Sequence, residues 1–189
     1  MGSCICQVVL PGLLPEISRR NIAKGDTVNH ISIDPGISGT GIAIWDRKKW
    51  DNNVPPLYVT NLMPQDHLDW VLNSERHVKH LKVIMSDWNV ITGTIEFPQY
   101  FQSAMGHAAT ADGKIYKLAC LVGVFMGAIW EFGGGIEPVL VNEWKGQLSK
   151  DAVIARIKRK CPAINNVSYE IKSHSWDAIG IGMYAKRTF

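Results

Sequence analysis

The chain has 189 residues, of which 46% are hydrophobic and 20% are charged, and its formal net charge is +3. These proportions are typical of a globular protein that buries a core of its own, and they exclude disordered and fibrous classes. The longest apolar run, from Leu118 to Trp130, has 13 residues, whereas a membrane-spanning helix needs about 20. We therefore interpret this run as a buried helix or a subunit interface, and we expect no association with a membrane.

The four cysteines stand at positions 4, 6, 120 and 161 and form no Cys-x-x-Cys pair. Free thiols in a reducing cytosol explain them best, so we expect a cytoplasmic protein. A zinc cluster is disfavoured, because no pair of cysteines or histidines has the spacing of a tetrahedral site.

Residues 1–27 are predicted to be a poorly ordered leader or accessory arm, because they show no sustained period and contain several proline and glycine residues. The opening Met1-Gly2-Ser3 resembles an acylation signal, but position 6 is Cys where that signal requires Ser or Thr. The domain proper is predicted to cover residues 28–189.

The first elements of this domain are predicted to form a β-hairpin. Alternating residues indicate a strand that ends at Asp34, a Pro- and Gly-containing turn follows, and a second strand covers 41–45. Further along, hydrophobic periodicity predicts strands over 57–60, 90–97 and 138–141 and helices over 65–88, 111–132, 149–160 and 173–186. A hairpin followed by alternating helices and strands indicates an α/β fold with a mixed sheet and helices on its faces.

Three acidic residues, Asp34, Glu96 and Asp177, stand in apolar stretches. An unpaired charge is costly to bury, so a shared role is indicated, and a divalent metal would offset the desolvation. Each acid also has an ordinary explanation, since Asp34 can bond its own turn and Glu96 can pair with a lysine. His174 precedes Asp177 by three residues, so on a helix both side chains share one face.

Two other patterns are not assigned to chemistry. Gly36, Gly39 and Gly41 precede a β-rich segment rather than the helix that a nucleotide-binding loop opens, which argues against a dinucleotide site. His77 and His80 are separated by three residues, as His174 and Asp177 are. Charged neighbours surround them in sequence, so we interpret them as part of a solvated helix face.

Basic residues are concentrated between positions 145 and 160, where the sequence contains six of them and one acidic residue, Asp151. They are Lys145, Lys150, Arg156, Lys158, Arg159 and Lys160. Such a cluster suits a polyanion, and a solvated basic helix face explains it equally well. Three aromatic residues and a glutamine stand just after Glu96: Phe97, Gln99, Tyr100 and Phe101. Their side chains can contact or stack on nucleic-acid bases. The alternative is that the aromatic residues belong to the core, as most aromatic residues do.

Four short motifs follow one another along the chain: Ile33-Asp34-Pro35-Gly36 with Thr40-Gly41, Ile95-Glu96, Trp144-Lys145-Gly146, and His174-x-x-Asp177-Ala178. Their order resembles the RuvC-like Holliday junction resolvases of the ribonuclease H-like superfamily, and phage-type members in particular, over about residues 28 to 187. The resemblance implies a single domain with a ribonuclease H-like mixed central sheet flanked by helices. It also implies a crossover junction endodeoxyribonuclease that nicks four-way or other branched DNA symmetrically and leaves 5′-phosphate and 3′-hydroxyl ends.

The same resemblance implies roles for individual residues. Asp34, Glu96, His174 and Asp177 would bind two Mg²⁺ ions per site, with Mn²⁺ as an alternative because one ligand is an imidazole. Lys145 and Lys150 would act as catalytic residues by offsetting negative charge in the transition state. Such resolvases are homodimers, and a phage-encoded one would work in the cytoplasm of the host cell.

One departure from the family pattern and two alternative classes of protein remain to be considered. The chain departs from the bacterial pattern in its leader and around Pro98-Gln99-Tyr100, where the family places a wedge against the junction, so branch selectivity is less certain than nuclease activity. A non-catalytic branched-DNA binding module on the same fold is the main alternative. An actin-like ATPase also begins with Asp-x-Gly, but it needs two lobes, and 189 residues are too few for both.

Overall fold

The computed structural model describes residues 28–50, 53–99, 112–167 and 170–189. Its strands are β1 (Asn29–Asp34), β2 (Thr40–Asp46), β3 (Tyr58–Leu62), β4 (Val90–Phe97) and β5 (Gly135–Leu140). Its α-helices are α1 (Trp70–Asp87), α3 (Lys114–Glu131), α4 (Val141–Trp144), α5 (Lys150–Lys160) and α6 (Ser173–Ala185), with short 3-10 turns at Arg47–Lys49 and Pro162–Asn166. The predicted leader, residues 1–27, lies outside the described residues.

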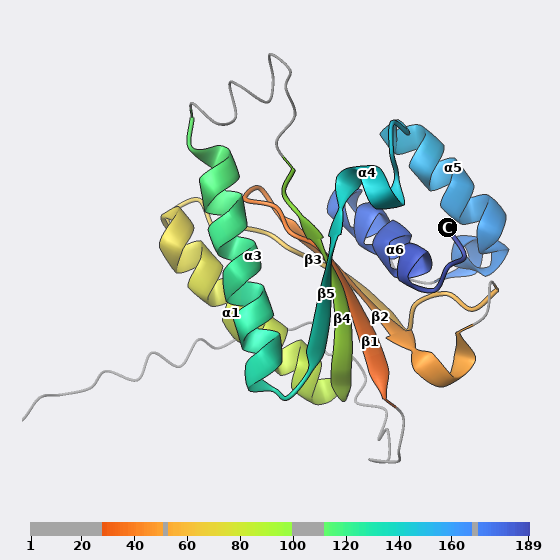
Figure 1. Cartoon of the computed structure of the whole chain (residues 1–189), viewed down its shortest axis with the longest axis horizontal. Coiled ribbons are helices and arrows are strands. Elements are labelled where there is room, and N and C mark those ends of the chain that lie inside the picture. The colour runs from red at the N-terminus through yellow and green to blue at the C-terminus, as the bar shows by residue number, and fades with distance from the viewer. Residues whose placement is uncertain (1–27, 51–52, 100–111, 168–169) are drawn as a thin grey trace, which may run out of the picture.

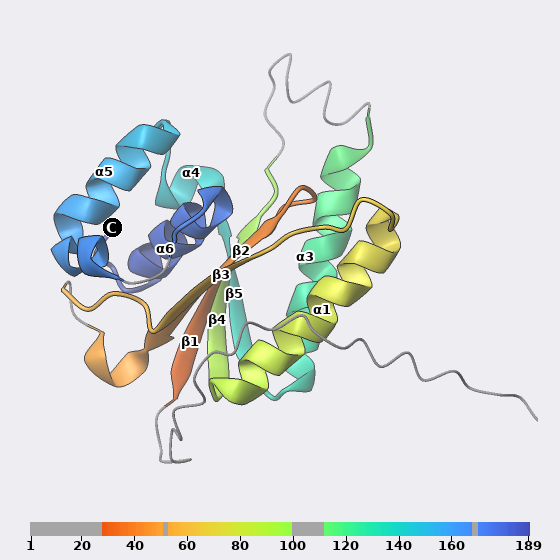
Figure 2. The ribbon, with the colours of Figure 1, turned by 180° about the vertical axis from the view of Figure 1, so that it is seen from behind.

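The five strands form one mixed sheet in the order β3-β2-β1-β4-β5. Strand β2 pairs antiparallel with β1 and β3, while β4 pairs parallel with β1 and β5. Figure 1 and the reverse view in Figure 2 show α1 and α3 on one face of this sheet and α4, α5 and α6 on the other. The predicted α/β fold with a mixed sheet and flanking helices is therefore confirmed.

The core has two parts because both faces of the sheet are covered. On β2, Ile42 and Ile44 point into the part under α1 and α3, whereas Ala43 and Trp45 point into the part under α5 and α6. Successive side chains of a strand face opposite sides, so a strand between two layers of helices has buried side chains on both faces. All six residues of β1 are buried for this reason, Asp34 included.

Helix α6 lies very close to β2 at the end where β1 finishes. A Cβ atom added at Gly41, the residue paired with Asp34, would run into the backbone carbonyl of His174. Only glycine leaves room for this approach, and the approach brings the first turns of α6 to the carboxyl end of β1.

Several element boundaries differ from the sequence prediction. Helix α1 begins at Trp70 rather than near Gln65, because the Asp69 carboxylate accepts the backbone N–H of Leu72 as an N-cap. The side chain of Asn73 then bonds the backbone of Gln65 and holds the preceding residues as a loop. Strand β5 begins earlier than predicted, at Gly135, and the short helix α4 was not predicted.

The interpretation of His77 as part of a solvated helix face is wrong. His77 is 2% exposed and sits on the core side of α1, and burial lowers the pKa of its imidazole. The charged residues that flank it in sequence lie on other sides of the helix, since a helix turns about 100° per residue.

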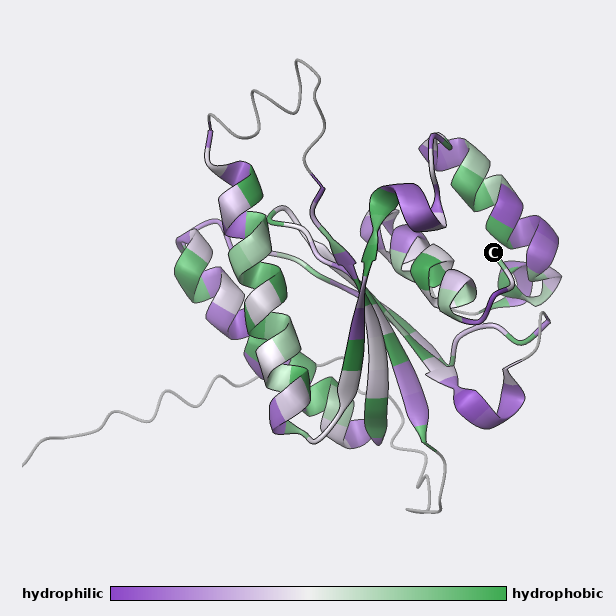
Figure 3. Cartoon of the chain, viewed as in Figure 1, coloured by the Kyte–Doolittle hydropathy of each residue, from purple (hydrophilic) through white to green (hydrophobic). Residues whose placement is uncertain are grey.

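The apolar run of α3 is core on one side only. Leu121, Val122 and Phe125 are buried, whereas Val124 and Trp130 are 48% and 57% exposed. In Figure 3 this helix is apolar over most of its length. Within the described residues, no helix has both the length and the apolar character needed to cross a membrane.

Candidate active site

The predicted catalytic residues come from five elements of the fold, which meet at one edge of the sheet. Asp34 ends β1, and Glu96 lies near the end of β4, the parallel neighbour of β1. His174 and Asp177 lie on the first turns of α6, Lys145 follows α4, and Lys150 begins α5. Because parallel strands end at the same edge, the fold places these side chains around one spot, where ligands gather in α/β sheets. Their catalytic and metal-binding roles stay predictions.

Asp34 and His174 form a close pair. The Nδ1 atom of His174 lies 2.8 Å from Oδ2 of Asp34. Burial raises the pKa of the Asp34 carboxyl, and the hydrogen bond with His174 opposes that rise. The same hydrogen bond raises the pKa of His174, so the pair favours a shared proton between an imidazole and a carboxylate.

Asp177 faces two lysines. Its Oδ2 accepts a hydrogen bond from Nζ of Lys150 at 3.2 Å, while Nζ of Lys145 lies 3.9 Å from its Oδ1. That second distance is too long for a hydrogen bond, and the buried Oδ1 has no hydrogen-bond partner among the described residues. Lys150 also donates to Oγ of Ser173 at 2.6 Å, which anchors the start of α5 to the start of α6.

Glu96 is held by a tryptophan. Nε1 of Trp144 donates a hydrogen bond to Oε2 of Glu96 at 2.8 Å. Burial first, and repulsion from Asp34 second, raise the pKa of Glu96 to about 7. The Trp144 bond and the charge of Lys145 act in the opposite direction and offset only part of the rise.

The three carboxylates repel one another in a partly buried place. Asp34 and Asp177 each raise the pKa of Glu96, and Asp177 also raises that of Asp34. Like charges at one site favour protonation or a bound cation. The lysines and the histidine supply positive charge, yet the pKa of Glu96 still stays well above its ordinary value.

The donor set suits a divalent metal in chemistry and charge. Carboxylate oxygens with one imidazole are ligands that Mg²⁺ or Mn²⁺ accept, and the unpartnered Oδ1 of Asp177 is a buried acceptor that a cation would satisfy. In the described part of the chain, however, no three His, Cys, Asp or Glu side chains already form a metal-binding group. Glu96, Asp177 and Asp34 are instead engaged by Trp144, Lys150 and His174.

The predicted DNA-contacting residues fall into two groups. Phe97 is 38% exposed at the end of β4 and Gln99 follows it, close to Glu96 in sequence, while Tyr100 and Phe101 lie outside the described residues. On α5, the Arg156 guanidinium lies 4.7 Å from the ring centre of Phe189, and Nζ of Lys158 lies 5.6 Å from that of Trp176.

The remaining basic residues of α5, Arg159 and Lys160, are exposed in its last turn. Basic side chains there also stabilise the negative end of the helix dipole. Their position is therefore compatible with DNA contact and with an ordinary structural role.

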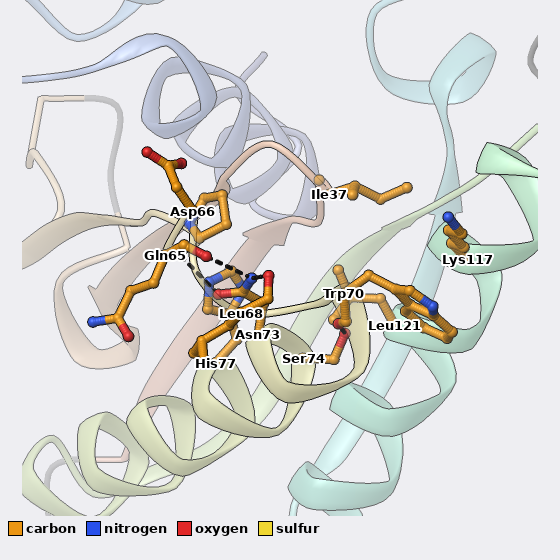
Figure 4. A pocket seen from close by; sticks show the side chains of 12 residues that line it. Ile37, Gln65, Asp66, Leu68, Trp70, Asn73, Ser74, His77, Lys117 and Leu121 are labelled. Atoms are coloured by element: carbon orange, nitrogen blue, oxygen red, sulfur yellow. Dashed lines mark hydrogen bonds between the residues drawn. The ribbon is translucent and has the colours of Figure 1, made fainter.

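A pocket of about 250 Å³ lies near the site but contains none of its acids. Figure 4 shows it between the turn at Ile37, the start of α1 at Trp70, and Leu121 on α3. Asn73 in its wall directs its polar atoms to the backbone of Gln65 and its neighbours. The polar atoms of Asn73 are thus used to hold the loop.

The sequence did not reveal the roles of Trp144 and Ser173 at this site. Trp144 entered only as part of a motif, and tryptophan in an apolar setting is usually core. The position of Trp144 directly before the predicted catalytic Lys145 was the one available signal.

No family model matches the chain, and no curated protein matches it in sequence. Among solved structures it is similar to Thermus thermophilus RuvC, with a TM-score of 0.64 and 16% identity over 85% of this chain and 96% of that one. A second structure of that protein, in complex with a Holliday junction substrate, gives a TM-score of 0.62 and 14% identity over the same shares. The Fowlpox virus resolvase in complex with Holliday junction DNA gives 0.53 and 13% over 85% of this chain and 99% of that one. The chain therefore has the ribonuclease H-like fold of these resolvases.

Proposed function

We propose that this protein is a metal-dependent, structure-selective endodeoxyribonuclease that resolves four-way junctions and other branched DNA. The observation that carries the proposal is the convergence of Asp34, Glu96 and Asp177, from β1, β4 and α6, with Lys145 and Lys150 beside them. The fold shared with RuvC and the fowlpox resolvase, both solved with Holliday junction DNA, supports the choice of substrate.

Two Mg²⁺ ions, or Mn²⁺ in their place, would be held by Asp34, Glu96, His174 and Asp177. Bound there, such ions supply an activated water and stabilise charge on the departing 3′-oxygen during in-line displacement at phosphorus. The products would carry 5′-phosphate and 3′-hydroxyl ends.

The two lysines would act on the phosphate. In the metal-free protein Lys150 and Lys145 are directed to Asp177. Once the charge of Asp177 is balanced by another cation, both ammonium groups are available to the negative charge that develops on the phosphoryl oxygens. The basic residues of α5 would add contacts to the DNA backbone, which carry affinity rather than sequence selectivity.

A homodimer is part of the proposal, since two symmetric nicks need two equivalent sites. Helices α1 and α3 expose apolar side chains on the face of the sheet away from α5 and α6. About half or more of the surface of each of four side chains is exposed there: Val71, Tyr116, Val124 and Trp130. We name this surface, with Trp70, the α1/α3 face, and we assign it to a second copy of the chain.

The direct test uses a labelled four-way junction with Mg²⁺ or Mn²⁺ and compares the wild type with Asp34→Asn and Asp177→Asn. Each variant removes one metal-binding charge with little change of shape, and we expect nicking to fall at least about 100-fold, as for loss of a major catalytic interaction. Glu137→Gln, which removes an exposed acid on β5, is the matched control and should nick like the wild type.

Two results would contradict the proposal in different ways. Equal nicking by the wild type and both aspartate variants would remove the metal-site assignment. Binding of the junction by the wild type, with no cleavage in either metal, would instead identify a non-catalytic branched-DNA binding module.

A further inference from the structure

Trp144 contacts two charged residues of the candidate site with two different parts of its indole. The edge donates Nε1–H to Oε2 of Glu96 at 2.8 Å, and Nζ of Lys145 lies 4.9 Å from the centre of the ring. We propose that Trp144 is the positioning residue of the site, orienting Glu96 through its N–H and Lys145 through its ring face. The inference rests on the proposed function and assigns a role to a residue that touches neither substrate nor metal.

The bond to Glu96 selects one orientation of a flexible carboxylate. An indole N–H can only donate, so it pairs with an acceptor oxygen of the Glu96 carboxyl. It occupies Oε2 and leaves Oε1 for a different partner. Hydrogen-bond donors behind a ligating carboxylate fix its orientation, and their loss typically weakens metal binding 10- to 100-fold.

The ring of Trp144 is itself fixed by close packing. Trp144 is 3% exposed, and Gly180 of α6 lies directly against its six-membered ring, where a Cβ atom would overlap the ring carbons. Phe189 packs edge-on against it with 5.5 Å between ring centres. A side chain confined in this way can transmit its orientation to the groups bonded to it.

The contact with Lys145 extends the same control to a positive charge. An ammonium group above an indole face is attracted by the ring quadrupole, and the same Nζ lies 3.9 Å from Oδ1 of Asp177. One buried ring thus contacts both an acid and a positively charged residue of the site.

Trp45 provides a matched comparison within the same protein. It is 1% exposed, its Nε1 donates to Oγ of Ser32 at 2.8 Å, and Gly182 of α6 packs against its ring. Both tryptophans belong to the same part of the core. The difference that matters here is that the bond of Trp144 ends on an acid of the candidate site, whereas that of Trp45 ends on a serine.

The experiment compares Trp144→Phe with Trp45→Phe in the full chain. Isothermal titration with Mn²⁺ gives the dissociation constant, and thermal unfolding reports the cost to the fold. Both variants lose one buried N–H donor, so we expect both to unfold at a lower temperature. Only Trp144→Phe should weaken Mn²⁺ binding, by about tenfold or more, and lower kcat for junction nicking with little change in KM, while Trp45→Phe should bind Mn²⁺ within about twofold of the wild type.

The outcomes separate this inference from the proposed function. Equal Mn²⁺ affinity in Trp144→Phe and the wild type, or equal weakening in both variants, would overturn the positioning role alone. Absence of Mn²⁺ binding to the wild type would overturn the proposed metal site. If Trp144→Phe does not fold, the wild type still decides, because addition of Mg²⁺ should shift the indole ¹⁵N–¹H resonance of Trp144 and leave that of Trp45 in place, and an unmoved Trp144 resonance would refute the inference.

Discussion

Glu96 is the acid whose charge depends most on conditions near neutrality. Its pKa is raised from 4.5 to about 7 by burial and by repulsion from Asp34. It is therefore partly protonated at neutral pH, and a cation that bound Glu96 would have to displace that proton.

The raised pKa predicts that Glu96→Gln stabilises the metal-free protein at high pH. Below about pH 4.5 the folded and unfolded chains both bind the proton, and the wild type carries no penalty. As the pH rises through about 7, the folded wild type must ionise an acid that the unfolded chain ionises easily, and its stability falls. We expect Glu96→Gln to exceed the wild type by about 1–3 kcal/mol near pH 8 and to equal it near pH 4.

Urea unfolding in the presence of a chelator at both pH values measures this difference. Glu137→Gln, an exposed acid on β5, is the control and should change stability little at either pH. A difference between Glu96→Gln and the wild type that does not grow with pH would contradict the assignment of the raised pKa to burial and repulsion.

The acids could be found from the sequence, but the tryptophan that holds Glu96 could not. Asp34, Glu96 and Asp177 stand out because a charge within an apolar stretch needs an explanation. Trp144 lies 48 positions from Glu96, and no local pattern joins an indole to an acid at that separation. The interpretation of His77 was wrong because its neighbours in sequence are charged, and they suggested a solvated position for a side chain that is buried.

At the level of elements, the contact between α6 and α4 depends on Gly180. Gly180→Ala places a Cβ atom into the Trp144 ring, so either the helix or the ring must shift, and such overpacking costs about 1–3 kcal/mol. We expect a lower free energy of unfolding together with weaker Mn²⁺ binding, because a displaced indole loses its bond to Glu96.

Gly135→Ala is the matched control, because an added Cβ atom at Gly135 meets nothing within 4 Å. Alanine there should leave stability unchanged or raise it slightly, by up to about 1 kcal/mol. Chemical unfolding and calorimetric titration of both variants check the pair. Unchanged stability and affinity in Gly180→Ala would show that the packing of α6 on Trp144 is looser than the structure indicates.

Long elements were predicted well and short or capped ones poorly. Strand β4 was predicted to the residue, because β-branched side chains fill it and Pro98 follows it. Helix α4 has four residues, too few for any period to show. The start of α1 depends on the side-chain bonds of Asp69 and Asn73, which act over several residues and override the apolar pattern that continues through the loop.

At the level of the whole molecule, the sheet separates two kinds of surface. The side with α5 and α6 carries basic side chains beside the acids, whereas the α1/α3 face is apolar. DNA and a second copy of the chain would therefore occupy different sides of one protomer. A dimer formed in the proposed way would leave both candidate sites uncovered.

The α1/α3 face predicts that Val124→Glu makes the protein monomeric. Val124 is 48% exposed on α3, so a charge there leaves the fold intact and opposes burial against a second copy. Light scattering after size-exclusion chromatography should give about half the mass of the wild type, if two copies associate as in a closed symmetric pair.

Leu57→Glu is the control, because Leu57 is 41% exposed outside the α1/α3 face and should not affect the mass. A dimer that persists in Val124→Glu would show that the second copy binds elsewhere. A wild type that is already monomeric at high concentration would contradict the proposed dimer.

Strand β1, which ends in Asp34, is bonded on both edges, to β2 and to β4, and all of its residues are buried. Backbone amides in such a position exchange their hydrogens with solvent only when the whole domain opens. The acid at its end is thus attached to a strand whose amides we expect to exchange slowly. Exchange of the β1 amides would therefore report on opening of the whole domain, and Asp34 should keep its place until the fold itself is lost.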